Sequence, residues 1–115
     1  MSMRGVSRAS FAELSERLSA EHITSATVAS RLASELFAVV GLLDTEHGLR
    51  RALSDPGKPA AERGEVVATL LHGKVTARAE GLVAAAAEAR WASSGDLSDS
   101  IEQLALPTGR FSVRL

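Results

Sequence analysis

The sequence predicts an all-α fold, a single six-helix bundle, and three observations favour it. Alanine and leucine dominate the composition, the alternation of apolar and polar residues typical of strands is nearly absent, and glycine and proline gather at a few points. The chain of 115 residues, 45% of them hydrophobic, is long enough for one domain with its own core. We expect this domain over residues 1–106, with an irregular tail over residues 107–115.

The first helix is marked by a capping residue and an apolar face. Ser7 or Ser10 can supply the side-chain oxygen that binds the free amides of a first helical turn. Apolar residues then follow at positions i, i+3 and i+7, namely Phe11, Leu14 and Leu18. This spacing predicts an amphipathic helix with one face turned toward the core.

A polar turn over residues 22–25 precedes the longest predicted helix, residues 26–43. Its buried stripe is expected to carry six apolar side chains: Val28, Leu32, Leu36, Val39, Val40 and Leu43. The length of this helix and its apolar stripe indicate a central element. Asp44 and Thr45 can end it and cap a short third helix over residues 46–53.

Two prolines and a glycine define the loop before the fourth helix, residues 54–59, because neither residue type propagates a helix. Pro59 suits the first turn of a helix over residues 60–71, where a missing amide hydrogen is tolerated. Gly73 fits the position just after the end of that helix.

The last two helices are separated by a short break. Thr76 is expected to cap a fifth helix over residues 77–91. A break at residues 94–96 then precedes a sixth helix over residues 97–106. Pro107 is expected to end the sixth helix, because proline lacks the amide hydrogen that a helix interior needs.

The sequence offers few groups for catalysis or for holding a metal or cofactor. Cysteine is absent, and none of the three histidines has a second ligand at i+3 or i+4. A glycine-rich phosphate loop and a Gly-x-Ser-x-Gly turn are both missing. Charged residues such as Glu13 with Arg17, and Glu62 with Arg63, are interpreted as solvated helix faces. We therefore expect a non-enzymatic protein without metal or cofactor.

Charge and hydropathy exclude further classes. Thirteen basic and fourteen acidic residues give a net charge of −1, whereas nucleic-acid binders usually have a basic excess. Aromatic residues make up 3% of the chain, too few for a base-stacking platform. The longest strictly apolar runs, residues 36–40 and 82–87, are far shorter than a membrane span, and the N-terminus lacks the apolar segment of a signal peptide. We expect a soluble, intracellular chain without membrane insertion.

The predicted fifth helix carries small residues on every side. They are seven alanines and one glycine: Ala77, Ala79, Gly81, Ala84, Ala85, Ala86, Ala87 and Ala89. One interpretation is a packed central helix that its neighbours approach closely. The other is that one small-residue face, with Gly81 and Ala85 at i and i+4, forms the floor of a groove for a partner helix. Both can hold, since a helix has more than one side.

Five segments resemble one protein family in their order and spacing. They are LRRALSDP at 49–56, VVATLLHGKV at 66–75, GLV at 81–83, ARW at 89–91 and DLSDSIEQLA at 96–105. The pattern is similar to the delta subunit of bacterial F-type ATP synthase, in its actinobacterial branch, whose mitochondrial counterpart is the oligomycin-sensitivity-conferring protein. The resemblance covers residues 7–106, and it lies in order and spacing rather than in one catalytic signature.

The resemblance implies a function. The N-terminal domain of that subunit is a six-helix bundle that links the catalytic head to the peripheral stalk. It holds N-terminal helices of alpha subunits, one of them in a groove between its first and fifth helices. Carried onto this chain, the groove is lined by Phe11, Leu14, Ser15 and Leu18 from the first helix, and by Gly81, Ala84, Ala85 and Glu88 from the fifth. The implied role is a non-catalytic stator subunit of a proton-translocating ATP synthase.

The resemblance also implies a location at the cytoplasmic face of the plasma membrane, as a peripheral part of the complex. The C-terminal region through which the family meets the b-subunit stalk has no counterpart after Pro107, so that contact is not expected of these residues. The alternative is a helical ligand-binding or regulatory interaction domain unrelated to ATP synthase. An apolar cavity with a few polar groups between helices would favour this alternative.

Overall fold

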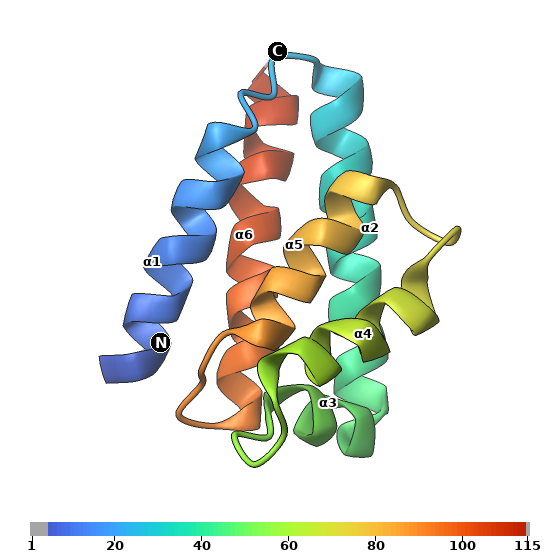
Figure 1. Cartoon of the computed structure of the whole chain (residues 1–115). Coiled ribbons are helices and arrows are strands. Elements are labelled where there is room, and N and C mark those ends of the chain that lie inside the picture. Colours follow the sequence, from blue (N-terminus) through green and yellow to red (C-terminus); the bar gives the residue numbers. More distant parts are fainter. Residues whose placement is uncertain (1–4, 115) are drawn as a thin grey trace.

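The computed structural model describes the backbone of residues 5–114 and the side chains of residues 5–106. Its helices follow in chain order: α1 (Gly5–Ala20), α2 (Ala26–Thr45), α3 (His47–Ser54), α4 (Ala60–Leu71), α5 (Ala77–Glu88) and α6 (Ser94–Arg114). The described residues contain no strand, only an isolated bridge between His72 and Val75. The predicted all-α fold with six helices is confirmed (Figure 1).

The two longest helices, α2 and α6, pack against each other at the centre of the bundle (Figure 1). Leu32, Leu36 and Leu43 on α2 and Ile101 on α6 are each at most 1% exposed. Burying a side chain of this size contributes roughly 1.5–3 kcal/mol. The predicted stripe of α2 is confirmed except at Val28, which is 37% exposed because it lies at the edge of the stripe in the first turn.

Among the described residues, α2 is the one helix long and apolar enough to cross a membrane, with a mean hydropathy of 1.5. Length and composition alone do not distinguish a membrane span from a core helix. In this structure 39% of that stretch is buried within the protein, on the face that packs against α6. The expected absence of membrane insertion stays a prediction.

The predicted boundary between α4 and α5 is confirmed. Gly73 follows α4 with a φ of 81°, a backbone conformation that favours glycine. The Thr76 hydroxyl accepts a hydrogen bond from the amide of Ala79 at 3.3 Å and thus caps α5. The carboxylate of Glu35 on α2 accepts hydrogen bonds from the amide and hydroxyl of Thr76, at 2.9 and 2.7 Å. The start of α5 is therefore fixed both locally and from α2.

The predicted capping role of Ser7 or Ser10 is wrong, because α1 begins at Gly5 and both serines are buried inside it. The Ser7 hydroxyl donates to Asp96 and accepts from the amide of Ala92, both at 2.7 Å. The Ser10 hydroxyl donates to the carbonyl of Arg90, also at 2.7 Å. These hydroxyls therefore join α1 to the segment between α5 and α6 and to the first turn of α6, instead of binding first-turn amides of α1.

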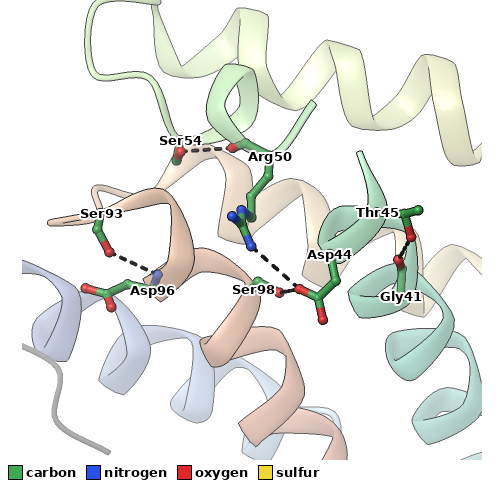
Figure 2. Close-up of polar contacts among 8 residues, drawn as sticks. All are labelled: Gly41, Asp44, Thr45, Arg50, Ser54, Ser93, Asp96 and Ser98. Atoms are coloured by element: carbon green, nitrogen blue, oxygen red, sulfur yellow. Dashed lines mark hydrogen bonds and ion pairs between the residues drawn. The ribbon is translucent and has the colours of Figure 1, made fainter. Parts of the chain in front are cut away.

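The predicted end of the fifth helix at residue 91 is also wrong, since α5 ends at Glu88. The chain turns there, and the buried Trp91 donates its indole N–H to the carbonyl of Ala86 at 2.7 Å. The sixth helix begins three residues earlier than expected, at Ser94. The Ser93 hydroxyl accepts from the amide of Asp96 at 3.3 Å, which satisfies a free donor of its first turn (Figure 2).

Asp44 and Thr45 do not cap α3. The residue at its N-cap is Glu46, whose side chain makes no capping hydrogen bond. The Thr45 hydroxyl donates to the carbonyl of Gly41 at 2.5 Å, within α2. Asp44 accepts from the Ser98 hydroxyl at 2.9 Å, and the same oxygen lies 3.6 Å from a guanidinium nitrogen of Arg50 (Figure 2). Asp44 therefore joins α2 to α6 and α3.

The predicted helix end at Pro107 is wrong, because α6 continues to Arg114. Proline removes one backbone hydrogen bond, but its fixed φ of about −65° is itself helical, so the backbone can continue through it. An irregular tail is thus not found over residues 107–114, and Leu115 lies outside the described residues, as do residues 1–4. The end of the six-helix domain at residue 106 stays a prediction.

Candidate functional site between α1 and α5

A hollow of about 310 Å³ lies between α1 and α5, which pack against each other. It is lined by seven residues: Ser10, Glu13, Leu14 and Arg17 of α1, Ala85 and Glu88 of α5, and Ala89. The four α1 residues recur at positions i, i+3, i+4 and i+7, and the other three at i, i+3 and i+4. The α1 set therefore forms one face of its helix, and the other set follows one side of the end of α5 into the residue after it.

The hollow has an apolar floor and a charged rim. Leu14 is 3% exposed, and Ala85 and Ala89 are half-buried against the core. The rim carries the exposed side chains of Glu13, Arg17 and Glu88. With the described residues, these three charged groups make no hydrogen bond or ion pair. The hollow thus combines a small apolar surface with charges that are available to a partner.

The structure brings together some of the residues predicted to line a groove. Leu14, Ala85 and Glu88 meet in the hollow. The others lie half-buried on the same two helices but outside its lining: Phe11, Ser15, Leu18, Gly81 and Ala84. A methyl group added at Gly81 would contact nothing within 4 Å, so that face of α5 is open. The predicted groove lining as a whole stays a prediction.

Four residues of the hollow are absent from the predicted groove lining: Ser10, Glu13, Arg17 and Ala89. The sequence predicts a solvated charged face for Glu13 and Arg17, and a capping role for Ser10. The signal that could find them is helical spacing: Ser10 and Arg17 lie at i−4 and i+3 from Leu14, and Glu13 lies at i+3 from Ser10 and i−4 from Arg17. This spacing identifies the hollow only when the position of the neighbouring helix α5 is known.

Arg63 on α4 is 5% exposed, which contradicts its predicted place on a solvated face. Its Nε donates to the carbonyl of Ala87 at 2.7 Å, and one terminal nitrogen donates to the carbonyls of Glu88 and Ala89 at 3.2 Å each. The other terminal nitrogen donates to two carbonyls of the 55–58 loop. The charge is buried because it binds the carbonyl end of α5, where a helix favours a cation.

Glu88 lies across Gly64 on α4. A Cβ at Gly64 would clash with a carboxylate oxygen of Glu88 and would lie 3.1 Å from its Cγ. Gly64 thus leaves room for the Glu88 side chain, which borders the α1–α5 hollow. At the other end of α5, Arg78 pairs with Glu21, just after α1, at 2.9 Å. The contact of Glu88 with Gly64 near one end of α5, and the Arg78–Glu21 pair near the other end, therefore both border the region between α5 and α1.

Other hollows, of about 530, 640 and 380 Å³, surround the loop between α3 and α4, and Lys58 borders all of them. Their linings mix charged and apolar side chains and include no residue of α1 beyond Val6. Among the described residues, no group of three His, Asp or Glu side chains is placed to hold a metal ion. In the α1–α5 hollow, predicted site residues from both helices meet.

No family model matches the chain, but comparison with known proteins identifies relatives that are named ATP synthase subunit delta. It is 42% identical over 102 residues to the ATP synthase subunit delta of Kineococcus radiotolerans, covering 89% of this chain and 37% of the relative. The corresponding protein of Streptomyces griseus is 41% identical over 103 residues, and that of Thermobifida fusca 42% over 104 residues. Each of these two alignments covers 90% of this chain and 38% of the relative.

The chain therefore spans a little over a third of the length of these curated relatives. The part of the relatives that it matches is their N-terminal domain. The similarity covers nearly all of α1 to α6, so it concerns the bundle as a whole and not one shared motif. Over these residues, the chain is similar to the N-terminal domain of ATP synthase delta subunits.

Proposed function

We propose that this chain works as a non-catalytic stator subunit in the peripheral stalk of an F-type ATP synthase. The observation that carries the proposal is the identity of about 40% with ATP synthase delta subunits over nine-tenths of the chain. The proposed location is the cytoplasmic face of the plasma membrane, as a peripheral part of the complex. The proposal assigns no contact with the b-subunit stalk to these residues.

The proposed partner site is the groove between α1 and α5, and its proposed occupant is an N-terminal helix of the alpha subunit. The hollow of about 310 Å³ supports this proposal, because a helix-binding groove needs a shallow apolar floor. Leu14 and Ala85 supply that floor. Gly81 would extend the floor along α5, because the space above it is open.

The charged rim would orient the bound helix. Glu13 and Arg17 on α1 and Glu88 on α5 border the same hollow, and they have no partner among the described residues. Rim charges of this kind select orientation and partner more than they add affinity. Apolar burial at roughly 25 cal/mol per Å² would provide most of the binding free energy, reduced by the cost of ordering the peptide.

A calorimetric titration with a synthetic peptide of the alpha-subunit N-terminal segment from the same organism tests the proposal. We expect saturable one-to-one binding and a gain of helical circular dichroism. Ala85→Asp should weaken binding by roughly a hundredfold, because it places an unpaired carboxylate against the apolar floor. Ala38→Asp, the same change at an exposed position of α2, is the matched control and should bind as the wild type does.

Binding by a folded Ala85→Asp variant at wild-type affinity would show that the groove lies elsewhere. A folded, monomeric wild type that does not bind the peptide would contradict the proposed partner. In that case, the alternative of a ligand-binding or regulatory helical domain would be the better interpretation.

A further inference from the structure

The carbonyl end of α5 is completed by side chains from other parts of the chain. A helix leaves the carbonyl groups of its last turn without intrahelical partners. In α5, Trp91 binds the carbonyl of Ala86, and Arg63 binds those of Ala87 and Glu88. Arg63 therefore acts as a C-terminal cap of α5, although it lies on α4 and far away in sequence.

The five chain positions after α5, residues 89–93, are called the 89–93 turn below. α4 holds this turn at its start, where Arg63 donates to the carbonyl of Ala89. α1 holds it further along, where Ser10 donates to the carbonyl of Arg90 and Ser7 accepts from the amide of Ala92. The turn therefore connects the end of α5 to the first half of α1.

Two of the carbonyl groups that Arg63 binds belong to residues that line the α1–α5 hollow, Glu88 and Ala89. We propose that Arg63 is a positioning residue for the partner groove: by holding the end of α5 and the 89–93 turn, it sets the position of α5 relative to α1. The inference rests on the function proposed above. Arg63 itself does not touch the partner, because its side chain is buried under the turn.

The chemistry of the guanidinium explains why arginine is needed at this position. Its five N–H donors lie in a fixed planar fork, and all five are used here by five carbonyl groups. A lysine keeps the charge but has three donors on one nitrogen atom. It cannot span the carbonyls of α5 and of the 55–58 loop at the same time. Arg63→Lys thus keeps the positive charge and removes the planar arrangement of five donors.

The test compares Arg63→Lys with Val40→Ala, a core variant on α2 that lies outside the groove and is also expected to lower stability. Both variants of the 115-residue chain are titrated with the alpha-subunit N-terminal peptide under conditions where unfolding curves show them to be folded. Arg63→Lys should bind about tenfold more weakly, the loss of roughly one hydrogen bond to a charged group. Val40→Ala should stay within about twofold of the wild type, as expected for distant sites.

A second measurement does not depend on the partner. The amide of Ala92 donates to Ser7 across the α1 contact, so its hydrogen exchange reports whether α1 still holds the 89–93 turn. In Arg63→Lys, this amide should lose about tenfold more protection than the core amides of α2. In Val40→Ala, both sets of amides should lose protection equally.

The two measurements distinguish the possible failures. Equal weakening of peptide binding in both variants, or unchanged relative protection of Ala92 in Arg63→Lys, would overturn the positioning role. A wild type that does not bind the peptide would contradict the proposed function. The exchange measurement would then decide by itself whether Arg63 positions α5 against α1.

Discussion

The two ends of α5 are held in different ways. At its start, Thr76 caps the helix from the adjacent position, and Glu35 of α2 reinforces the cap. At its end, the carbonyl groups are bound by Arg63 of α4 and by Trp91. The start of α5 is thus capped by the residue next to it, with a further contact from α2, whereas its end depends on Arg63 from α4.

This difference explains which boundary sequence analysis can predict. A threonine before an alanine-rich segment is a cap that local chemistry favours in any fold. An arginine 24 residues before the carbonyl that it binds has no local signature. Because alanine continues a helix readily, the sequence predicts that the segment after Glu88 stays helical to residue 91. Tertiary contacts of Arg63 and Trp91 end the helix earlier.

Removal of the Arg63 side-chain donors is the strongest test of this difference. Arg63→Met should lower the free energy of unfolding by roughly 3 kcal/mol, because carbonyl groups in a largely buried region lose their donors. Urea unfolding followed by helical circular dichroism measures the change. The control is Arg31→Met on α2, whose side chain is 70% exposed and should change stability by less than about 0.5 kcal/mol. Similar losses in both variants would contradict the capping role of Arg63.

A smaller effect is expected at the start of α5. The Thr76 hydroxyl donates to Glu35 and accepts from the amide of Ala79. Thr76→Ala should therefore lower the free energy of unfolding by about 1–2 kcal/mol, and Thr76→Ser by less than about 0.5 kcal/mol. Thermal and urea unfolding of the two variants give the comparison. If serine cost as much as alanine, packing of the threonine methyl group would explain the loss better than the hydroxyl.

Most of the fold could be predicted because its signals are local. The apolar stripe of α2, Gly73 and the proline-containing loop each act through backbone conformation or helical periodicity. The errors concern polar side chains whose partners are distant in sequence. Ser7 and Asp44 are good caps in isolation, but both hydrogen-bond to residues of α6 instead. Sequence spacing alone does not reveal these partners.

The candidate site was predictable only in outline, and for the same reason. Leu14 and Ala85 follow from small or apolar residues at helical spacing, combined with the family resemblance. Glu13 and Arg17 share the face of Leu14, but their place on the rim depends on where α5 crosses α1. That crossing depends in turn on the buried Arg63, which sequence analysis interprets as a surface charge. A correct prediction of the rim therefore requires the tertiary contacts of α4.

The smallest expected effect concerns Gly64, and it tests whether Glu88 lies across α4. Replacing a helical glycine by alanine usually stabilises a helix by about 1 kcal/mol. In Gly64→Ala, the displacement of the Glu88 carboxylate should offset most of that gain, so the free energy of unfolding should rise by less than about 0.5 kcal/mol. In a Glu88→Ala background the obstacle is absent, and Gly64→Ala should give the full gain. Urea unfolding of the four proteins completes a double-mutant cycle, in which equal gains in both backgrounds would show that Glu88 does not pack on Gly64. Unequal gains would mean that the end of α5, unlike its start, is fixed by α4 through Glu88 as well as through Arg63.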